Sequence, residues 1–178
     1  GFCVLNDVAV AIRVLRRDAR LARALVIDLD VHQGNGTAAL FESDPSVFTF
    51  SMHGERNYPM RKMRSTLDVG LADGVGDADY LALLQRHLDA IFAAFTPDLV
   101  FYLAGVDPVR GDRYGRLALT DDGLRRRERC VLEACASRGR PVVITIAGGY
   151  APTPERTADL HALVFEEAVA VLRTQADH

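Results

Sequence analysis

The chain has 178 residues, 49% of them hydrophobic, which is enough to bury the core of one α/β domain. A net charge of −3 and the lack of a basic stripe argue against a protein that binds nucleic acid or an anionic membrane. No apolar run reaches the roughly 18 to 20 residues that a transmembrane helix needs. Three cysteines without a C-x-x-C pair favour a reducing, cytoplasmic setting. Since the chain opens at Gly1 without an initiator methionine, we expect it to be a piece of a longer protein.

Apolar periodicity predicts helices and strands in alternation. Helices are expected at Cys3–Arg17, near 37–41, at 77–95, between a Thr120 N-cap and a Gly139 C-cap, and at 158–172. Strands are expected at 24–29, 47–52, 98–104 and 141–146, and a long loop from His53 to Asp68. This alternation predicts an α/β fold with a mainly parallel, open sheet and helices on both faces.

One predicted helix carries a cluster of basic residues. Its members are Arg125, Arg126, Arg127 and Arg129. We interpret them as a solvated face, because charged side chains on a helix usually point to water. They do not amount to a nucleic-acid-binding stripe.

Polar residues interrupt the strand expected at 24–29 as it ends. Side chains along a strand alternate between its faces, so Asp28, Asp30 and His32 are predicted to share one face. Two neighbouring buried carboxylates need a compensating charge, and a bound cation supplies one. Oxygen and nitrogen ligands suit zinc, iron or another first-row divalent ion, and these residues alone do not choose among them.

Other candidate residues follow the later strands, at the sheet edge where open α/β sheets bind ligands. Asp107 is expected to complete an Asp-His-Asp set that leaves positions open for water and substrate, although an Asp before Pro is also common in turns. Tyr150 follows two glycines and is either a packing aromatic or a hydrogen-bond donor to a reacting oxygen. His53 is expected to hold its loop or to bind a ligand, and His87, His161 and His178 to be structural or exposed.

The stretch Gly34–Ala39, GNGTAA, also matches the permissive G-x-G-x-x-A dinucleotide fingerprint. Asp28 and Asp30 would place two negative charges beside a bound pyrophosphate, and the helix expected after the motif is short. We therefore favour the hypothesis that these glycines let the backbone turn sharply beside a metal.

Several motifs together resemble the histone deacetylase superfamily, the zinc-dependent amidohydrolases that include acetylpolyamine amidohydrolases and acetoin-utilisation proteins. The chain looks most similar to bacterial and class IV members. The motifs occur in the family's order: GFCVLND at 1–7, DLDVHQGNGT at 28–37, SMH at 51–53, LAGVDP at 103–108, DRYGRLALT at 112–120 and AGGY at 147–150. The resemblance covers essentially all 178 residues and implies an arginase/deacetylase-like fold.

The resemblance also implies two metal sites. Asp30, His32 and Asp107 match the family's zinc ligands, with iron as a possible replacement for zinc. Asp28 matches a residue that helps to bind a structural potassium ion, and Ser51 contributes to the same site. The three zinc ligands are the same set that the strand ends indicate.

For catalysis, the resemblance implies that Asn35 orients a catalytic histidine and that Tyr150 donates a hydrogen bond to the oxyanion. Residues that match the wall of an acyl-lysine tunnel are Gly1, Phe2, Tyr58 and Gly149.

The implied activity is a zinc-dependent hydrolysis that removes acetyl groups from acetyl-lysine in proteins or from related acetylated amines. Zinc would polarise the amide carbonyl and a water molecule, and a histidine would take the water's proton. Because the family's paired catalytic histidines lie just before the GFC motif, residues 1–178 are expected to be a partial catalytic domain that lacks its N-terminal part and is inactive alone. The alternative is a non-catalytic module that binds acyl-lysine or a partner through the same tunnel. The sequence leaves the oligomeric state undetermined.

Overall fold

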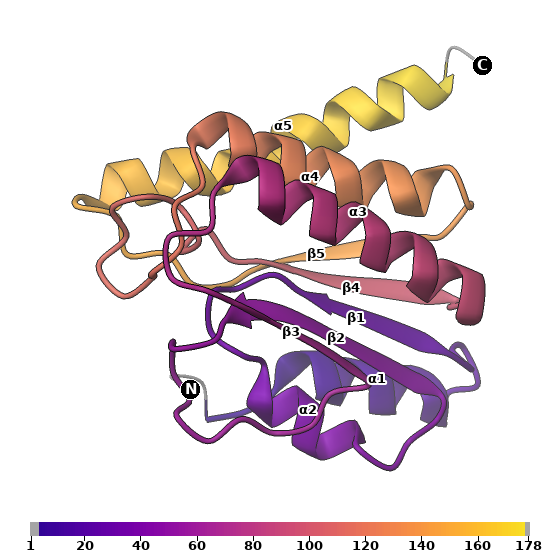
Figure 1. The fold of residues 1–178 in the computed structure, drawn as a ribbon. Coiled ribbons are helices and arrows are strands. Elements are labelled where there is room, and N and C mark those ends of the chain that lie inside the picture. The colour runs from indigo at the N-terminus through magenta and orange to yellow at the C-terminus, as the bar shows by residue number, and fades with distance from the viewer. Residues whose placement is uncertain (1–3, 177–178) are drawn as a thin grey trace.

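The computed structural model describes residues 4–176, which form a parallel sheet between two layers of helices (Figure 1). Within these residues the sheet has the strand order β3-β2-β1-β4-β5, and every neighbouring pair is parallel. The strands are β1 (Ala24–Asp28), β2 (Val47–Gly54), β3 (Leu67–Leu71), β4 (Leu99–Ala104) and β5 (Val142–Ile146). The predicted α/β fold with a parallel sheet is confirmed.

Helices cover both faces of the sheet, as the sequence predicted. In Figure 1, α1 (Asp7–Arg17) and α2 (Asn35–Phe41) lie on one face, and α3 (Asp77–Ala94), α4 (Asp121–Ala136) and α5 (Pro154–Ala176) lie on the other. Each face has its own apolar core, and β1 is buried along its whole length because it contributes side chains to both. No helix within residues 4–176 is long and apolar enough to cross a membrane.

The direction in which strands are added reverses between β1 and β4. From β1 the sheet grows outward through β2 to β3, and β4 and β5 then extend it on the other side of β1. At such a switch point a crevice opens outside the carboxyl ends of the two central strands. Asp30 and His32 follow β1 and Asp107 follows β4, so the topology brings the expected metal ligands to the carboxyl ends of these two strands.

The first helix begins later than predicted. α1 starts at Asp7, because the side chain of Asn6 caps it by accepting a hydrogen bond from the Ala9 N–H at 2.8 Å. Val4, which was expected on the buried face of this helix, is 98% exposed. Cys3, the expected first residue of the helix, lies outside the described residues, as do Gly1, Phe2 and His178.

The connection between β2 and β3 is shorter than the loop predicted from His53 to Asp68. β2 continues to Gly54 and β3 begins at Leu67, so residues 55–66 form the connection. The sequence pattern did not predict β3, because this strand lies at the edge of the described sheet and includes an aspartate and a glycine, which are poor strand formers. His53 is therefore a buried strand residue and not a loop residue.

The last helix is longer than the predicted 158–172. Its start carries two signals that the periodicity alone did not show. Pro154 occupies the first helical position, and the hydroxyl of Thr153 accepts a hydrogen bond from the Arg156 N–H at 3.2 Å. The helix α5 therefore begins at Pro154.

One of the four clustered arginines of α4 is not solvated. Arg127 is 0% exposed, so the prediction for this residue was wrong. Leu124, Arg127 and Val131 follow one another at spacings of three and four residues, and all three are buried on the same face of α4. Leu124 and Val131 belong to the apolar core on this side of the sheet, and the Arg127 side chain reaches the Leu29 carbonyl after β1.

Candidate metal centre

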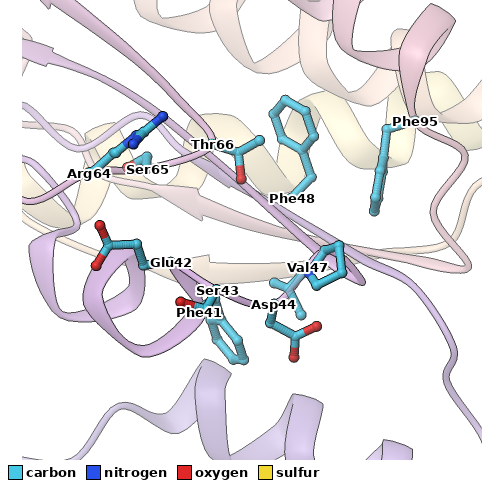
Figure 2. Close-up of a pocket in the computed structure, with 11 residues that line it drawn as sticks. Phe41, Glu42, Ser43, Asp44, Val47, Phe48, Arg64, Ser65, Thr66 and Phe95 are labelled. Carbon is cyan, nitrogen blue, oxygen red and sulfur yellow. The ribbon is translucent and has the colours of Figure 1, made fainter.

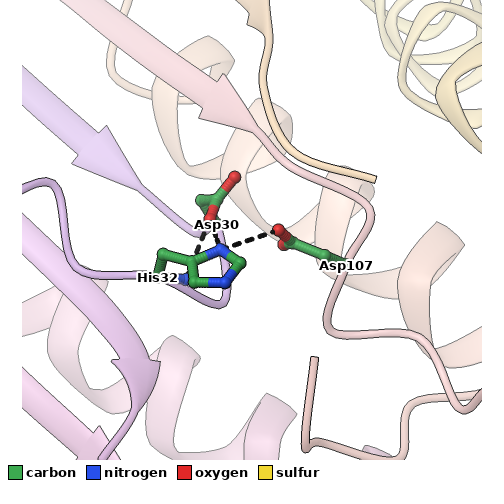
Figure 3. Close-up of side chains that lie close together, drawn as sticks. All are labelled: Asp30, His32 and Asp107. Atoms are coloured by element: carbon green, nitrogen blue, oxygen red, sulfur yellow. Dashed lines mark hydrogen bonds and ion pairs between the residues drawn. The ribbon is translucent and has the colours of Figure 1, made fainter. Parts of the chain in front are cut away.

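Two carboxylates and an imidazole converge beyond the carboxyl ends of β1 and β4 (Figure 3). His32 Nδ1 lies 2.9 Å from Asp30 Oδ1 and 3.1 Å from Asp107 Oδ2. The ligand atoms that the three residues offer all lie within 4.8 Å of one another. The structure thus brings together three side chains from two segments that are far apart in the sequence.

Backbone amides hold both carboxylates in place. The Val31 N–H donates to Asp107 Oδ1 at 2.8 Å. Val31 lies between Asp30 and His32, so this bond ties the segment after β1 to the aspartate after β4. The Gly148 N–H donates to Asp30 Oδ2 at 2.6 Å. These contacts join the segments after β1, β4 and β5 into one site.

Glycines leave the space that the carboxylates occupy. A Cβ on Gly148 would lie 2.1 Å from Asp107 Oδ2 and 2.5 Å from Asp30 Oδ2. A Cβ on Gly105 would lie 2.7 Å from Asp30 Oδ2. Any larger residue at either position would push into the site.

Burial and mutual contact shift the ionisation of these side chains. Burial, with the nearby charge of Asp30, raises the pKa of Asp107 to about 7. Hydrogen bonds to Asp107 and Asp30 raise the pKa of His32 to about 10. Burial alone would raise the pKa of Asp30, but its hydrogen bonds to His32 and Gly148 lower it below its usual value. The two carboxylates thus favour a positive charge between them, which either a proton on His32 or a metal ion supplies.

The three residues fit a divalent metal of the first transition row. Two carboxylate oxygens and one imidazole nitrogen are ligands that zinc and iron accept, and the donor set does not choose between these metals. The His32 side chain is 23% exposed whereas that of Asp107 is fully buried, so the site opens to solvent on the His32 side. An open side is what a catalytic metal needs for water and substrate.

Asp28 is not one of the three residues whose ligand atoms converge within 4.8 Å, and its place on the same face as Asp30 and His32 stays a prediction. β1 ends at Asp28, and the backbone bends at residues 30–32. The Asp28 carboxylate accepts a hydrogen bond from the Asp30 N–H at 3.1 Å and faces Gly34, where a Cβ would lie 2.2 Å from Asp28 Oδ2. Burial and the charge of Asp30 raise the pKa of Asp28 well above its usual value.

Ser51 and His53 lie on β2, beside the end of β1. Ser51 is paired in register with Asp28. Its hydroxyl lies 3.0 Å from His53 Nδ1, and both residues are buried. Burial lowers the pKa of His53. Asn35, the first residue of α2, is half-buried.

Tyr150 lies two residues after Gly148, whose N–H bonds Asp30. Its backbone N–H donates to Asp112 Oδ2 at 2.6 Å, and its backbone oxygen accepts from the Arg113 N–H at 3.0 Å. Its ring meets the ring of Tyr114 edge-on, with centroids 4.8 Å apart. The side chain is 37% exposed, and burial raises the pKa of its hydroxyl. Tyr150 therefore has a packing contact and also lies close in sequence to Gly148, which bonds Asp30.

The residues expected in the tunnel wall are only partly described. Tyr58 lies in the 55–66 connection and is exposed. Gly149 is packed closely, since a Cβ there would lie 2.4 Å from Val106. His161 of α5, expected to be structural or exposed, is half-buried, and its Nε2 would lie 3.2 Å from the same Cβ.

Asp112 has a structural role that the sequence analysis missed. One oxygen of its carboxylate accepts the N–H groups of Tyr114 and Gly115, each at 2.8 Å, and the other accepts the Tyr150 N–H. An aspartate that starts a turn is a recognisable signal in the motif DRYG. The link to Tyr150 required the tertiary structure.

Gln33 is a second buried residue that the sequence analysis missed. Its side chain donates to the Met63 carbonyl at 2.7 Å and to Asp68 at 2.8 Å, and it accepts from the Met63 N–H at 2.8 Å. It joins the segment after His32 to the 55–66 connection. The sequence offers no signal for this role.

A separate pocket of about 410 Å³ lies away from the metal centre (Figure 2). Its walls come from the end of α2, the start of β2 and the residues before β3, and they include Phe41, Asp44, Val47 and Ser65. This is the amino end of β2, whereas the metal centre lies beyond the carboxyl ends of β1 and β4. None of the three converging side chains lines this pocket.

The structure is an α/β fold in which three side chains that could hold a metal ion, Asp30, His32 and Asp107, converge at the switch point of a parallel sheet. A family model described as "Histone deacetylase domain" matches residues 1–167, and the chain therefore belongs to the histone deacetylase family. The family membership that the motifs implied is confirmed.

Relatives of this chain include both plant and bacterial proteins. An uncharacterised protein of Picosynechococcus is 50% identical over 169 residues, which cover 95% of this chain and 54% of the relative. Histone deacetylase 2 of Arabidopsis thaliana is 32% identical over 159 residues, which cover 88% of this chain and 41% of the relative. The crystal structure of acetylpolyamine aminohydrolase from Burkholderia pseudomallei matches with a TM-score of 0.79 at 29% identity, over 96% of this chain and 51% of that one. The chain thus spans about half the length of these relatives.

Proposed function

We propose that the protein is a metal-dependent amide hydrolase that removes acetyl and related acyl groups from acetylated amines. Asp30, His32 and Asp107 would hold zinc, with iron as the alternative. The observation that carries the proposal is the convergence of their ligand atoms within 4.8 Å in a chain of the histone deacetylase family. One relative is a histone deacetylase and another an acetylpolyamine aminohydrolase, so acetyl-lysine in proteins and acetylated small amines are both candidate substrates.

A divalent cation in this site would act as a Lewis acid toward the amide carbonyl and would lower the pKa of a water molecule. Asp30 and Asp107 supply the negative charge that holds the cation, and the backbone amides of Gly148 and Val31 keep them in place. The partly exposed side of His32 leaves room for the substrate.

We also propose that Tyr150 donates a hydrogen bond to the carbonyl oxygen as negative charge develops on it. The segment that carries Tyr150 is held at both ends, because Gly148 bonds Asp30 and the Tyr150 N–H bonds Asp112. Such anchoring keeps the donor in position before the reaction begins. Asn35 is proposed to orient the histidine that acts as general base.

The acyl chain would enter along a tunnel lined by Tyr58 and Gly149, together with Gly1 and Phe2, which are outside the described residues. The Asn57 side chain donates to the Tyr114 carbonyl at 2.6 Å and so links the loop of Tyr58 to the residue whose ring contacts Tyr150. This link supports a common wall made from both segments.

Asp28 and Ser51 are proposed to help bind a structural potassium ion. They are register partners at the ends of β1 and β2, and the Asp28 carboxylate is buried. Its raised pKa reflects the cost of burying that charge, which a monovalent cation would reduce.

The test uses the full-length protein. Metal analysis is combined with hydrolysis assays on an acetyl-lysine peptide and on an acetylated polyamine, for the wild type and for Asp107→Ala. Asp122→Ala is the control, because Asp122 is an exposed carboxylate on α4. We expect near-stoichiometric zinc or iron and turnover of at least one substrate, with both lost in Asp107→Ala.

Two results would contradict the proposal. Full metal retention in Asp107→Ala would refute the ligand assignment. A metal-loaded wild type that binds the acetyl-lysine peptide without hydrolysing it would favour the non-catalytic binding module instead.

A further inference from the structure

A buried ion pair lies behind the metal centre. Arg127 and Glu128 of α4 are 0% and 1% exposed, and the Arg127 guanidinium donates to the Glu128 carboxylate. Removing two charges from water costs free energy that their attraction does not always return, so apolar residues often replace such pairs without loss of stability. The contacts of the pair with its surroundings therefore indicate what it does.

Arg127 contacts the peptide group that leads into the metal centre. Its Nη1 donates to the Leu29 carbonyl oxygen at 3.1 Å. That oxygen and the Asp30 N–H belong to the same planar peptide group. The Asp30 N–H donates to Asp28 Oδ1 at 3.1 Å, so the peptide group is held from both sides. Asp30 begins directly after it, and His32 follows two residues later.

The arginine is itself oriented by the strand that leads to Asp107. The second oxygen of the Glu128 carboxylate accepts the hydroxyl proton of Tyr102, a fully buried residue of β4. The carbonyl of Leu103, the next residue of β4, accepts the Leu29 N–H at 3.2 Å. Arg127 and Glu128 thus connect the segment after β1 with the strand whose end carries Asp107.

We propose that Arg127 is a positioning residue for the metal centre. It fixes the Leu29–Asp30 peptide group so that Asp30 and His32 face Asp107. The inference rests on the proposed metal site, although Arg127 itself contacts neither a ligand side chain nor the open side of the site. Arginine suits the role because its planar fork bonds Leu29 and Glu128 at once, whereas a lysine ammonium is a single point charge.

The experiment compares Co²⁺ binding by the metal-stripped full-length wild type with that of two variants. Arg127→Met with Glu128→Gln removes the ion pair without leaving an unpaired charge, and the new amide side chain still offers an oxygen to Tyr102. Arg126→Met is the matched control, since the Arg126 side chain is 60% exposed on the same helix. Co²⁺ affinity and the visible absorption spectrum of the bound ion are measured, and thermal unfolding checks the fold.

We expect the double variant to unfold cooperatively but to bind Co²⁺ about 10- to 100-fold more weakly, the usual effect of losing a residue that orients a metal ligand. Its Co²⁺ spectrum should change, because the spectrum follows ligand geometry. Arg126→Met should leave both unchanged.

A folded double variant with wild-type affinity and spectrum would overturn the inference and leave the pair a purely structural one. If the double variant does not fold, Arg127→Lys decides, because lysine keeps the charge beside Glu128 but has a single nitrogen in place of the two, Nη1 and Nη2, that bond Leu29 and Glu128. Weaker Co²⁺ binding by this variant supports the inference, and unchanged binding overturns it. If the wild type binds no Co²⁺, the proposed metal site itself is wrong. If the wild type binds Co²⁺ and the Arg127 variant binds it equally well, only the role of Arg127 is wrong.

Discussion

Replacing Gly148 by alanine tests the metal centre with the smallest possible change. The added Cβ would lie 2.1 Å from Asp107 Oδ2 and 2.5 Å from Asp30 Oδ2. To restore ordinary van der Waals contact, the two carboxylates would have to move by roughly 1 Å. Asp107 is buried and bonded to the Val31 amide, so it cannot move without disturbing the segment that carries His32.

A displacement of about 1 Å in a reacting group costs on the order of 10²-fold in rate. This corresponds to about 2.7 kcal/mol of lost transition-state stabilisation. Backbone strain does not add to the effect, because Gly148 is not among the glycines with positive φ. We therefore expect Gly148→Ala to fold while it loses metal affinity and about 10²-fold in kcat/KM.

The assay measures metal content and kcat/KM on an acetyl-lysine peptide, using the full-length protein. Gly36→Ala is the control, because the nearest atom to its added Cβ, Asn6 Nδ2, is 3.9 Å away and the residue lies in α2. Alanine in a helix should stabilise the protein by about 0.5–1 kcal/mol. Wild-type metal content and rate in Gly148→Ala would refute the argument from crowding.

Three further predictions concern single side chains. Tyr150→Phe should lower kcat on the order of 10²- to 10³-fold with unchanged metal content, and near wild-type kcat would make Tyr150 a wall residue. In protein stripped of metal, Tm should fall as the pH rises from about 6.5 toward 10. The fold raises the pKa of His32 from 6.5 to about 10. The stability that protonated His32 contributes is therefore complete below pH 6.5 and is lost as the pH rises through 10. His32→Gln should flatten this dependence, and an equally steep profile in the variant would assign it to other groups. The wild type should have a higher Tm in potassium chloride than in choline chloride, whereas Asp28→Asn should have the same Tm in both salts. Equal Tm values for the wild type in the two salts would count against the potassium site.

Local sequence patterns were sufficient to predict the layout of the fold and the place where Asp30, His32 and Asp107 converge. Alternating helical and strand periodicities predict a parallel sheet, and the carboxyl ends of parallel strands meet at one edge. Asp30, His32 and Asp107 follow two of those strands, so these patterns and a general rule of topology were enough to bring them together. The Thr120 cap was also predicted correctly, because the hydrogen bond from the Gly123 N–H spans three residues.

The surroundings of that centre followed only from tertiary packing. Where β1 ends follows from its pairing with β2 and β4, and Asp28 is its last residue. Arg127 lies on the same helix face as Leu124, but its burial depends on how α4 packs on the rest of the fold. Its partner Leu29 is 98 residues away in the sequence. Local patterns describe what a side chain prefers, whereas the cost and use of a buried charge depend on which distant groups the fold brings to meet it.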